Sequence, residues 1–290
     1  MIHPERTAAG KRQKNRLLSA LFAAGTICAL GAAAWPFAAQ TLSCLQAQQT
    51  GSQYLQTGRS TDQAALFQKE EQYRQVNDWI KERGFQWAWQ DENNIPSALQ
   101  SLLPGKGEMV AALEIPAIGL NLPVYFGTDS AVLEKGAGLL EGSSLPVGGC
   151  GSHAVMTGHT GLQTALLFSK VNRLKEGDRI VVKTPLRAMT YEVIRMQTVL
   201  PEEAGRLEPA DGQDLITLIT CTPYGINSHR LLVTAQRVPE LSSGTPASLS
   251  VPNSLPFFVL AGPGAAALGG VICLLLFFRH RFAKKENQNQ

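Results

Sequence analysis

The stretch LITLITC, residues 215–221, is an apolar, β-branched run that ends in a thiol, Cys221. The turn-forming segment TPYGINSH, residues 222–229, follows it, and a second apolar run opens with Arg230. β-Branched residues favour strands, whereas Pro, Gly and Asn favour turns. The pattern therefore predicts a strand, a loop and a return strand. Cys221 would lie at the end of its strand, where a thiol can meet a substrate.

Short runs of the same kind occupy most of the chain from residue 109 onward. Turn residues separate them at spacings typical of a closed or nearly closed β-barrel, so the fold is predicted to be mainly β. A Gly/Ser/Pro loop is expected over residues 141–151, and short helices over residues 129–134 and 162–174. The predicted strands are Met109–Ile115, Leu122–Tyr125, His153–Thr157, Arg179–Lys183, Thr190–Val199, Leu215–Cys221 and Arg230–Arg237.

A helical flank is expected before this barrel. Leu66, Tyr73, Val76 and Ile80 recur at helical spacing, which predicts a helix over Thr61–Arg83 with Thr61 as its cap. A Gln-rich stretch precedes this helix, and an irregular passage with Trp and Pro residues follows it. The whole flank is expected to stand beside the barrel, as a stalk or as a lid over the thiol.

Two uncharged stretches are long enough to cross a bilayer, which needs about 20 apolar residues. They cover residues 17–39 and 255–278, and Lys and Arg residues lie on the terminal side of each. The positive-inside rule places both basic ends in the cytoplasm and the rest of the chain outside the cell. A cleaved signal peptide is the alternative for the first stretch, although its apolar run exceeds the ~7–15 residues of a signal h-region.

These features divide the chain by composition. The expected segments are a cytoplasmic tail (1–16), a transmembrane helix (17–39), an extracellular helical flank (40–108), a β-barrel catalytic domain (109–240), a Ser/Pro-rich linker (241–254), a second transmembrane helix (255–278) and a second cytoplasmic tail (279–290).

Charge and cysteine content narrow the possible partners. The formal net charge of +3 comes largely from the two basic tails, and no basic stripe interleaved with aromatics is present between them, so we expect no nucleic-acid partner. Cys44, Cys150 and Cys221 would lie outside the cell, and an odd count there suggests a free thiol. A Cys44–Cys150 disulfide would leave Cys221 free, but the sequence does not establish it. The chain contains no paired ligand spacing such as Cys-x-x-Cys, so the sequence does not predict a metal site.

A nucleophilic Cys221 needs partners, because a thiol attacks as the thiolate. His159 follows the predicted strand His153–Thr157 in a loop with glycine on both sides, and glycines suit a loop that a ligand approaches closely. Pairing of the two later strands would return Arg230 to the end that holds Cys221. An imidazole can move protons and a guanidinium can hold an oxyanion, so together the groups would form an acyl-transfer site. Taken singly, they fit a packed thiol, a surface-loop histidine and a solvated arginine.

The segment LITCTPYGINSHRLLV, residues 218–233, resembles the active-site strand and loop of the class C, pilin-polymerising sortases. Other similar segments are LEIPAI (113–118), LPVYFGT (122–128), LLEGSSLPVGG (139–149) and HAVMTGH (153–159). The resemblance runs from about Met109 to Arg237 in the order found in that family, and the two membrane stretches fit it as well.

This resemblance implies a sortase-type closed β-barrel and a cysteine transpeptidase that needs no cofactor. Cys221 would be the nucleophile, His159 the general acid and base, and Arg230 the group that stabilises the substrate carbonyl. The enzyme would cleave the Thr–Gly bond of a Leu-Pro-x-Thr-Gly-like signal and join the pilin to a lysine of the next pilin. His153 and His229 would be structural or would support the site indirectly.

Two features depart from that family. Class C enzymes commonly carry a lid with Asp-Pro and an aromatic residue, whereas this chain has no Asp-Pro; Trp87 or Trp89 could fill the groove instead. Cys150, in the loop before His153, has no assigned meaning. The alternatives are a sortase that attaches single proteins to cell-wall peptide, an L,D-transpeptidase, whose Ser-x-Gly-Cys type of motif is absent, and a non-catalytic membrane-tethered β-domain.

Overall fold

The barrel and its helical flank belong to one compact unit, Leu42–Leu249. The structure is a computed structural model, and it describes residues 5–83, 95–160, 168–204, 207 and 212–239. All the strands described below lie within this unit, so the predicted flank and the predicted barrel pack together.

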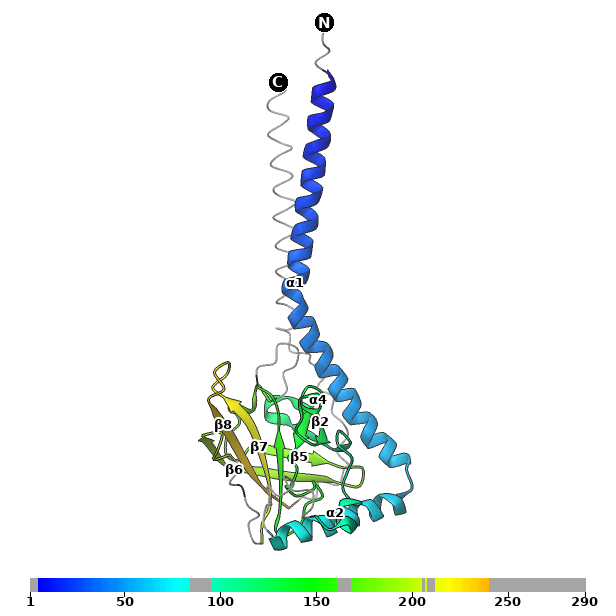
Figure 1. Ribbon diagram of the computed structural model, residues 1–290, viewed down its shortest axis with the longest axis vertical. Helices are drawn as coiled ribbons and strands as arrows, with labels where there is room; N and C mark the ends of the chain where they lie inside the picture. Colours follow the sequence, from blue (N-terminus) through cyan, green and yellow to red (C-terminus); the bar gives the residue numbers. More distant parts are fainter. Residues whose placement is uncertain (1–4, 84–94, 161–167, 205–206, 208–211, 240–290) are drawn as a thin grey trace. The chain divides into compact units, whose positions relative to one another are not determined.

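A closed barrel with the strand order β1-β2-β3-β4-β7-β8-β6-β5 forms the centre of the fold (Figure 1). Neighbouring strands are antiparallel except for β2–β3 and β4–β7, which are parallel. The mainly β, closed-barrel prediction is confirmed, and each predicted strand is present within two residues of its predicted ends. The strands are β1 (Met109–Ile115), β2 (Leu120–Phe126), β3 (Ala137–Leu139), β4 (Ser152–Thr157), β5 (Arg179–Lys183), β6 (Ala188–Val199), β7 (Asp214–Thr222) and β8 (His229–Arg237).

The strands near Cys221 are buried on both faces. Ile216 and Leu218 of β7 belong to the main core inside the barrel, together with Val233 of β8. Ile219 of β7 and Leu232 of β8 instead belong to a smaller cluster on the other face. Because successive strand residues point to opposite faces, this double burial explains why apolar residues in the run at 215–221 occur on both faces rather than alternating with exposed polar ones.

One strand was not predicted from the sequence. β3 pairs in parallel with β2 and in antiparallel with β4, and it contains only three residues. A side chain at Gly136 would collide with the backbone carbonyl of Pro123, and one at Gly138 with that of Gly127. Glycine is therefore needed for close backbone approach, and so short and glycine-rich a strand carries no alternation signal.

The first helix is longer than expected, whereas the second begins two residues after its predicted start. α1 (Glu5–Ser60) runs without interruption into the unit that holds the barrel, and α2 (Gln63–Arg83) follows after a short turn. Asp62, rather than the predicted Thr61, caps α2, because its carboxylate accepts a 3.0 Å hydrogen bond from the backbone N–H of Ala64. α3 (Ser97–Gln100) interrupts the passage that was expected to be irregular.

The helix predicted over 162–174 is wrong for the part that the structure describes. Residues 168–170 form a turn, and Val171–Arg173 form the short 3₁₀ helix η4. Phe168, Val171 and Leu174 are all buried, and this spacing of three suits a 3₁₀ segment, in which such positions lie above one another. Two further short elements are η3 (Pro116–Ile118) and α4 (Ser130–Leu133), the latter close to the predicted helix at 129–134.

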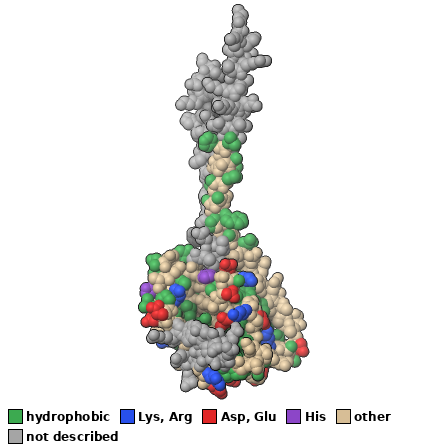
Figure 2. All heavy atoms as spheres, in the orientation of Figure 1, with side chains coloured by type: hydrophobic (Ala, Val, Ile, Leu, Met, Phe, Trp, Pro, Cys, Tyr) green, Lys and Arg blue, Asp and Glu red, His purple; other side chains and the backbone are tan. Residues whose placement is uncertain are grey.

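Among the described residues, one helical stretch, Leu21–Gly58 of α1, is long and apolar enough to cross a membrane by length and composition. The described side chains of this stretch are hydrophobic or uncharged polar, with no Lys, Arg, Asp or Glu among them (Figure 2). The second predicted membrane stretch, 255–278, lies outside the described residues, as do its linker and basic tail.

α2 packs on the barrel through specific polar contacts as well as apolar ones. The side chain of Asn77 donates a 2.9 Å hydrogen bond to the carbonyl of Leu145 and accepts a 2.7 Å hydrogen bond from the N–H of Leu145. These two bonds fix the loop over 141–151 on α2. Buried Glu70 pairs with Arg74 of the same helix and with Arg187 at the β5–β6 turn. From α1, the Tyr54 hydroxyl donates 3.1 Å to the carbonyl of Val110 in β1.

Candidate active site

Cys221 is the penultimate residue of β7 and is half-buried, so the thiol lies at a strand end as predicted. Its side chain follows Ile219 on the face opposite the main core, since residues two apart in a strand share a face. The thiol is free, as are those of Cys44 and Cys150, so the considered Cys44–Cys150 disulfide is not formed.

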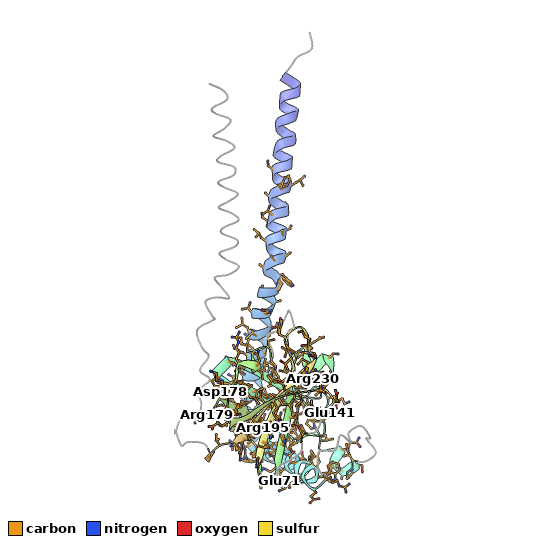
Figure 3. The ribbon with its side chains drawn as sticks, turned by 90° about the vertical axis from the view of Figure 1, so that its left-hand side faces the viewer. Glu71, Glu141, Asp178, Arg179, Arg195 and Arg230 are labelled. Atoms are coloured by element: carbon orange, nitrogen blue, oxygen red, sulfur yellow. The ribbon has the colours of Figure 1, made fainter. Side chains whose placement is uncertain are left out.

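Arg230 lies directly opposite Cys221 in the antiparallel β7–β8 pair. Residues so paired have Cβ atoms about 4.5–5.5 Å apart and project from the same face. The Nη1 atom of Arg230 donates 3.1 Å hydrogen bonds to the carbonyls of Asn227 and His229, so the loop holds the guanidinium near the strand end. Arg230 lies at the upper end of the barrel in Figure 3.

His159 lies just beyond the end of β4, the other neighbour of β7. Paired residues of β4 and β7 keep one constant register, which ends with Thr157 opposite Ile219. The Gly158 N–H then donates 3.2 Å to the Ile219 carbonyl, which carries the pairing past the last strand residue. Residues on the same face of a strand are two apart, so extending this register by two residues places His159 level with Cys221. The thiol is therefore flanked by the His159 loop on one side and by Arg230 on the other.

Thr220 fastens these segments together, and this role was missed in the sequence. Its hydroxyl donates a 2.8 Å hydrogen bond to the carbonyl of Gly158 and is also hydrogen-bonded to the hydroxyl of Thr160. Since the single Thr220 proton goes to Gly158, Thr160 is the donor in the second bond. The residue before the thiol thus bonds to residues on both sides of His159. The available signal was the Thr157-Gly-His-Thr160 pattern, which places a hydroxyl beside the imidazole.

Gly158 has a packing role that differs from the one expected. A side chain there would come within 2.7 Å of the ring of Phe168, which is 1% exposed. The glycine before His159 therefore makes room for a core aromatic rather than for a ligand. The Phe168 N–H also donates 3.1 Å to the His159 carbonyl, which connects the imidazole loop to the core.

An apolar cluster adjoins Cys221 on the same outer face. It contains Val155 of β4, Ile219 of β7, Leu232 of β8 and Ala204, with Leu140, Val199 and Leu207 packed against it. Beyond the thiol, the loop between β7 and β8 turns at Gly225 and exposes two large apolar side chains, Tyr224 at 67% and Ile226 at 72%. A buried apolar cluster therefore precedes the thiol along β7, and exposed apolar side chains follow it in the β7–β8 loop.

The two other histidines of the barrel, His153 and His229, have other partners. His153 is buried, and its Nε2 lies 2.7 Å from the Thr217 hydroxyl, which in turn lies 3.0 Å from that of Thr234. His229 contacts the Ser228 hydroxyl through Nδ1 at 2.9 Å and pairs with Thr222 rather than with Cys221. Within the described ranges, no group of three or more His, Cys, Asp or Glu side chains is arranged to hold a metal ion.

Comparison with known proteins shows which family has this fold. The sortase domain pattern matches residues 113–238. The chain is 35% identical to sortase C1 from Streptococcus agalactiae, covers 98% of that structure and 66% of its own length, and superimposes with a TM-score of 0.60. The chain belongs to the sortase family. Sortases are cysteine transpeptidases, so the fold is that of an enzyme family rather than of a purely structural β-domain.

Two further relatives differ in how much of their length aligns with this sortase. It is 36% identical to a sortase C from Streptococcus pneumoniae, with a TM-score of 0.57 and coverage of 97% of that structure and 66% of this chain. It is 27% identical over 117 residues to sortase A from Streptococcus agalactiae serotype III, which is 39% of this chain. The chain spans about half of that curated relative, 47% of its length.

The residues predicted to form a lid fall in a part of the chain that the structure does not describe. Trp87 and Trp89, the predicted substitutes for the missing Asp-Pro lid, lie outside the described residues. Cys150 is exposed in the loop before β4, and its carbonyl accepts a 3.3 Å hydrogen bond from Lys81 of α2. That contact holds the loop on the helix. It involves the backbone carbonyl of Cys150 and not its thiol.

Proposed function

We propose that this sortase is a class C enzyme that polymerises pilins, with Cys221 as nucleophile, His159 as general acid and base, and Arg230 as the group that stabilises the substrate carbonyl. The observation that carries the proposal is the register of β4, β7 and β8, which flanks the thiol with the imidazole loop and the guanidinium. The sortases C of S. agalactiae and S. pneumoniae support the class, and the latter is described in terms of pilin substrate specificity.

The first step is acylation. The Cys221 thiolate attacks the threonine carbonyl of a Leu-Pro-x-Thr-Gly-like signal, and the carbonyl oxygen takes up the negative charge. Arg230 donates hydrogen bonds to this oxygen, where a fixed cation stabilises the charge that develops. The C–N bond to glycine breaks, His159 gives its proton to the departing amine, and a thioester to Cys221 remains.

The second step transfers the acyl group to an amine. A lysine of the next pilin attacks the thioester carbon, and His159 takes the proton that the attacking amine loses. The C–S bond breaks, Cys221 returns as the thiolate, and an isopeptide bond joins the two pilins. Each step makes one bond to the carbonyl carbon and breaks another, so neither a redox partner nor a cofactor is needed.

The surroundings of Cys221 suit a protein substrate. The edge of the apolar cluster, formed by the partly buried Leu140, Val199 and Leu207, offers a surface for the Leu and Pro of the signal. Tyr224 and Ile226 on the exposed loop offer a contact for the folded pilin, since exposed apolar patches beside a site mark interaction surfaces.

The proposed cellular arrangement keeps both ends in the cytoplasm. Residues 17–39 and 255–278 would cross the membrane, residues 1–16 and 279–290 would remain inside, and the flank and barrel over 40–240 would face outward. Lys and Arg at both ends support this orientation. Pilins emerging from the cell would then meet the thiol at the outer surface.

The test is an in vitro ligation with the full chain in lipid nanodiscs. A pilin with a C-terminal Leu-Pro-x-Thr-Gly-like signal is offered two amines at equal concentration, a lysine-bearing pilin and a cell-wall-type peptide. The proposal predicts a ladder of covalent pilin multimers with lysine isopeptide bonds, identified by mass spectrometry. A product joined only to the cell-wall peptide would instead indicate the enzyme that anchors single proteins.

The matched variants are Cys221→Ala and Cys150→Ala. Both remove one thiol from the outer domain, but only the first removes the proposed nucleophile. Multimers should disappear with Cys221→Ala and persist with Cys150→Ala. Equal rates with and without the Cys221 thiol would overturn the catalytic assignment.

A further inference from the structure

A cavity lies at the end of the barrel opposite Cys221 and Arg230. It has a volume of about 180 Å³ and is lined by α1, α2, the start of β1, the loop at Val147 and the β5–β6 turn. α2 runs along the lower end of the barrel in Figure 1, and Glu71 of α2 lies at the opposite end from Arg230 in Figure 3. No step of the proposed transpeptidation uses this cavity.

The cavity lining is mainly apolar and carries one unused hydrogen-bonding group. Leu66, Val110, Val147 and Pro185 contribute to its walls, together with the ring of Tyr73. Tyr73 is 6% exposed, and among the described residues none offers its hydroxyl a hydrogen-bond partner. Buried polar groups of this kind are rare in folded proteins, because leaving one unsatisfied destabilises the fold.

The two charged side chains in the cavity lining, Lys69 and Glu70, each already have an oppositely charged partner. Lys69 lies 2.5 Å from Glu108, and buried Glu70 pairs with both Arg74 and Arg187. No charge in the lining therefore awaits a counter-ion, so a charged ligand would lose hydration without gaining a partner. The lining favours a neutral occupant.

The size of the cavity corresponds to one aromatic ring with a small substituent. An apolar cavity of about 150 Å³ is sufficient to bind benzene. Burial raises the pKa of Tyr73 above its usual value near 10, with the nearby Glu108 carboxylate adding to the shift. The phenol therefore keeps its proton at neutral pH and can donate it to an acceptor.

We propose that this cavity is a binding site for a small neutral aromatic molecule that carries one acceptor oxygen, which receives a hydrogen bond from Tyr73. A bound ring would contact α1, α2 and the barrel at once. Because a ligand stabilises the state that binds it, occupancy would hold the helical flank against the barrel. The proposal is independent of the substrate and of the acceptor amine at Cys221.

Anisole and ethylbenzene provide a matched pair of probes, since they share a shape and differ by an ether oxygen against a methylene. Each is titrated into the methyl-labelled full chain in lipid nanodiscs, with affinities expressed against the free aqueous probe concentration. Saturable shifts of the Val110 and Val147 methyl signals are expected with anisole. The absence of saturable shifts would overturn the proposal.

The Tyr73→Phe variant isolates the hydrogen bond. The ratio of the ethylbenzene Kd to the anisole Kd should fall about three- to tenfold in this variant, the contribution of one neutral hydrogen bond. An unchanged ratio would show that Tyr73 does not contact the oxygen and would contradict the proposed ligand class.

A filled-cavity variant locates the site. Leu66→Trp places a larger side chain in the cavity wall and should abolish the shifts caused by both probes. Phe67→Trp is the matched control, because Phe67 is the exposed neighbour on α2 and does not line the cavity. Shifts that persist unchanged in Leu66→Trp would place the probes elsewhere and refute the site.

Discussion

Thr220 donates a 2.8 Å hydrogen bond to the carbonyl of Gly158, which joins the residue before Cys221 to the residue before His159. Thr220 is 3% exposed, so this bond is shielded from competing water. The thiol strand and the imidazole loop are otherwise far apart along the chain. Their relative position therefore depends on this side chain as well as on the backbone pairing of β4 and β7.

Removing the Thr220 hydroxyl should slow catalysis without weakening substrate binding. Thr220→Val keeps the shape of the side chain but loses both hydrogen bonds, so the His159 loop is held less firmly. We expect kcat to fall about tenfold, the equivalent of ~1.4 kcal/mol, with KM nearly unchanged. Steady-state kinetics with a sorting-signal peptide measures both values.

Thr220→Ser is the control for that change, because it keeps the hydroxyl and should retain most of the wild-type kcat. The pH dependence of kcat/KM should also change in Thr220→Val, since the imidazole is no longer positioned. A lower melting temperature with unaltered kinetics would indicate a purely structural role for Thr220.

Arg230 should matter through the geometry of its guanidinium as well as its charge. Arg230→Ala removes the donor opposite Cys221, and loss of one oxyanion-stabilising group typically costs about 10²–10³ in rate. Arg230→Lys should recover only part of that loss, because an ammonium lacks the planar fork of donors. Thioester formation followed by mass spectrometry measures the effect.

Arg195 supplies the comparison for Arg230. It is an exposed arginine on the neighbouring strand β6, where it pairs with Thr234 rather than with a residue of the site (Figure 3). Arg195→Ala should leave the acylation rate within about twofold of wild type. Equal losses in Arg195→Ala and Arg230→Ala would mean that general surface charge, rather than a contact at the thiol, controls the rate.

Glu70 should stabilise the attachment of α2 to the barrel. Glu70→Gln leaves Arg74 and Arg187 without their counter-charge, and Glu70 is only 7% exposed. We expect the unfolding free energy to fall by roughly 1–3 kcal/mol. For a domain of this size, each kcal/mol lowers the melting temperature by about 2–4 °C.

Glu71→Gln is the matched control, since Glu71 is the exposed neighbour on the same helix. Thermal denaturation followed by circular dichroism should show a drop for Glu70→Gln and almost none for Glu71→Gln. An equally small drop in melting temperature in both variants would show that the Glu70 ion pairs do not hold α2 on the barrel.

The raised pKa of Tyr191 predicts that the folded state loses stability at alkaline pH. Burial, followed by the charge of Asp214 and the hydrogen bond to it, raises the pKa of Tyr191 above its usual value near 10. The folded state thus keeps a proton that the unfolded state loses. The stabilisation is complete below about pH 10 and is lost as the pH rises from there towards the folded pKa.

Urea unfolding between pH 8 and pH 11 measures this effect. A group that is protonated only in the folded state contributes up to about 1.4 kcal/mol of lost stability per pH unit. Tyr191→Phe should be less stable at pH 8, because it lacks the 3.0 Å bond to Asp214, and its stability should fall less steeply above pH 10. An identical slope in both proteins would contradict the prediction.

The barrel and half of the site were accessible from the sequence, for local reasons. β7 and β8 follow one another with a short loop between them, so pairing of Cys221 with Arg230 could be expected from chain order alone. β-Branched runs with turn residues between them also placed the other long strands. Such signals arise from neighbouring residues and need no knowledge of distant contacts.

The remaining features depend on contacts between distant segments. The parallel pairing of β4 with β7 puts His159 level with Cys221, and no property of either segment specifies that register. β3 is defined by close backbone approach at Gly136 and Gly138 rather than by a pattern of side chains. The segment at 168–174 has apolar residues that also fit an α-helix, and only burial against the core favours the shorter 3₁₀ turn.

The most direct test of the central claim is to trap the acyl-enzyme with a Leu-Pro-x-Thr-Gly-like pilin signal, without an acceptor amine, and to locate the adduct by mass spectrometry. The account predicts one thioester adduct, on Cys221, that accumulates in the wild type and is absent in Cys221→Ala. It should then transfer to lysine when a second pilin is added. An adduct on Cys44 or Cys150, or one that forms equally without Cys221, would contradict the account.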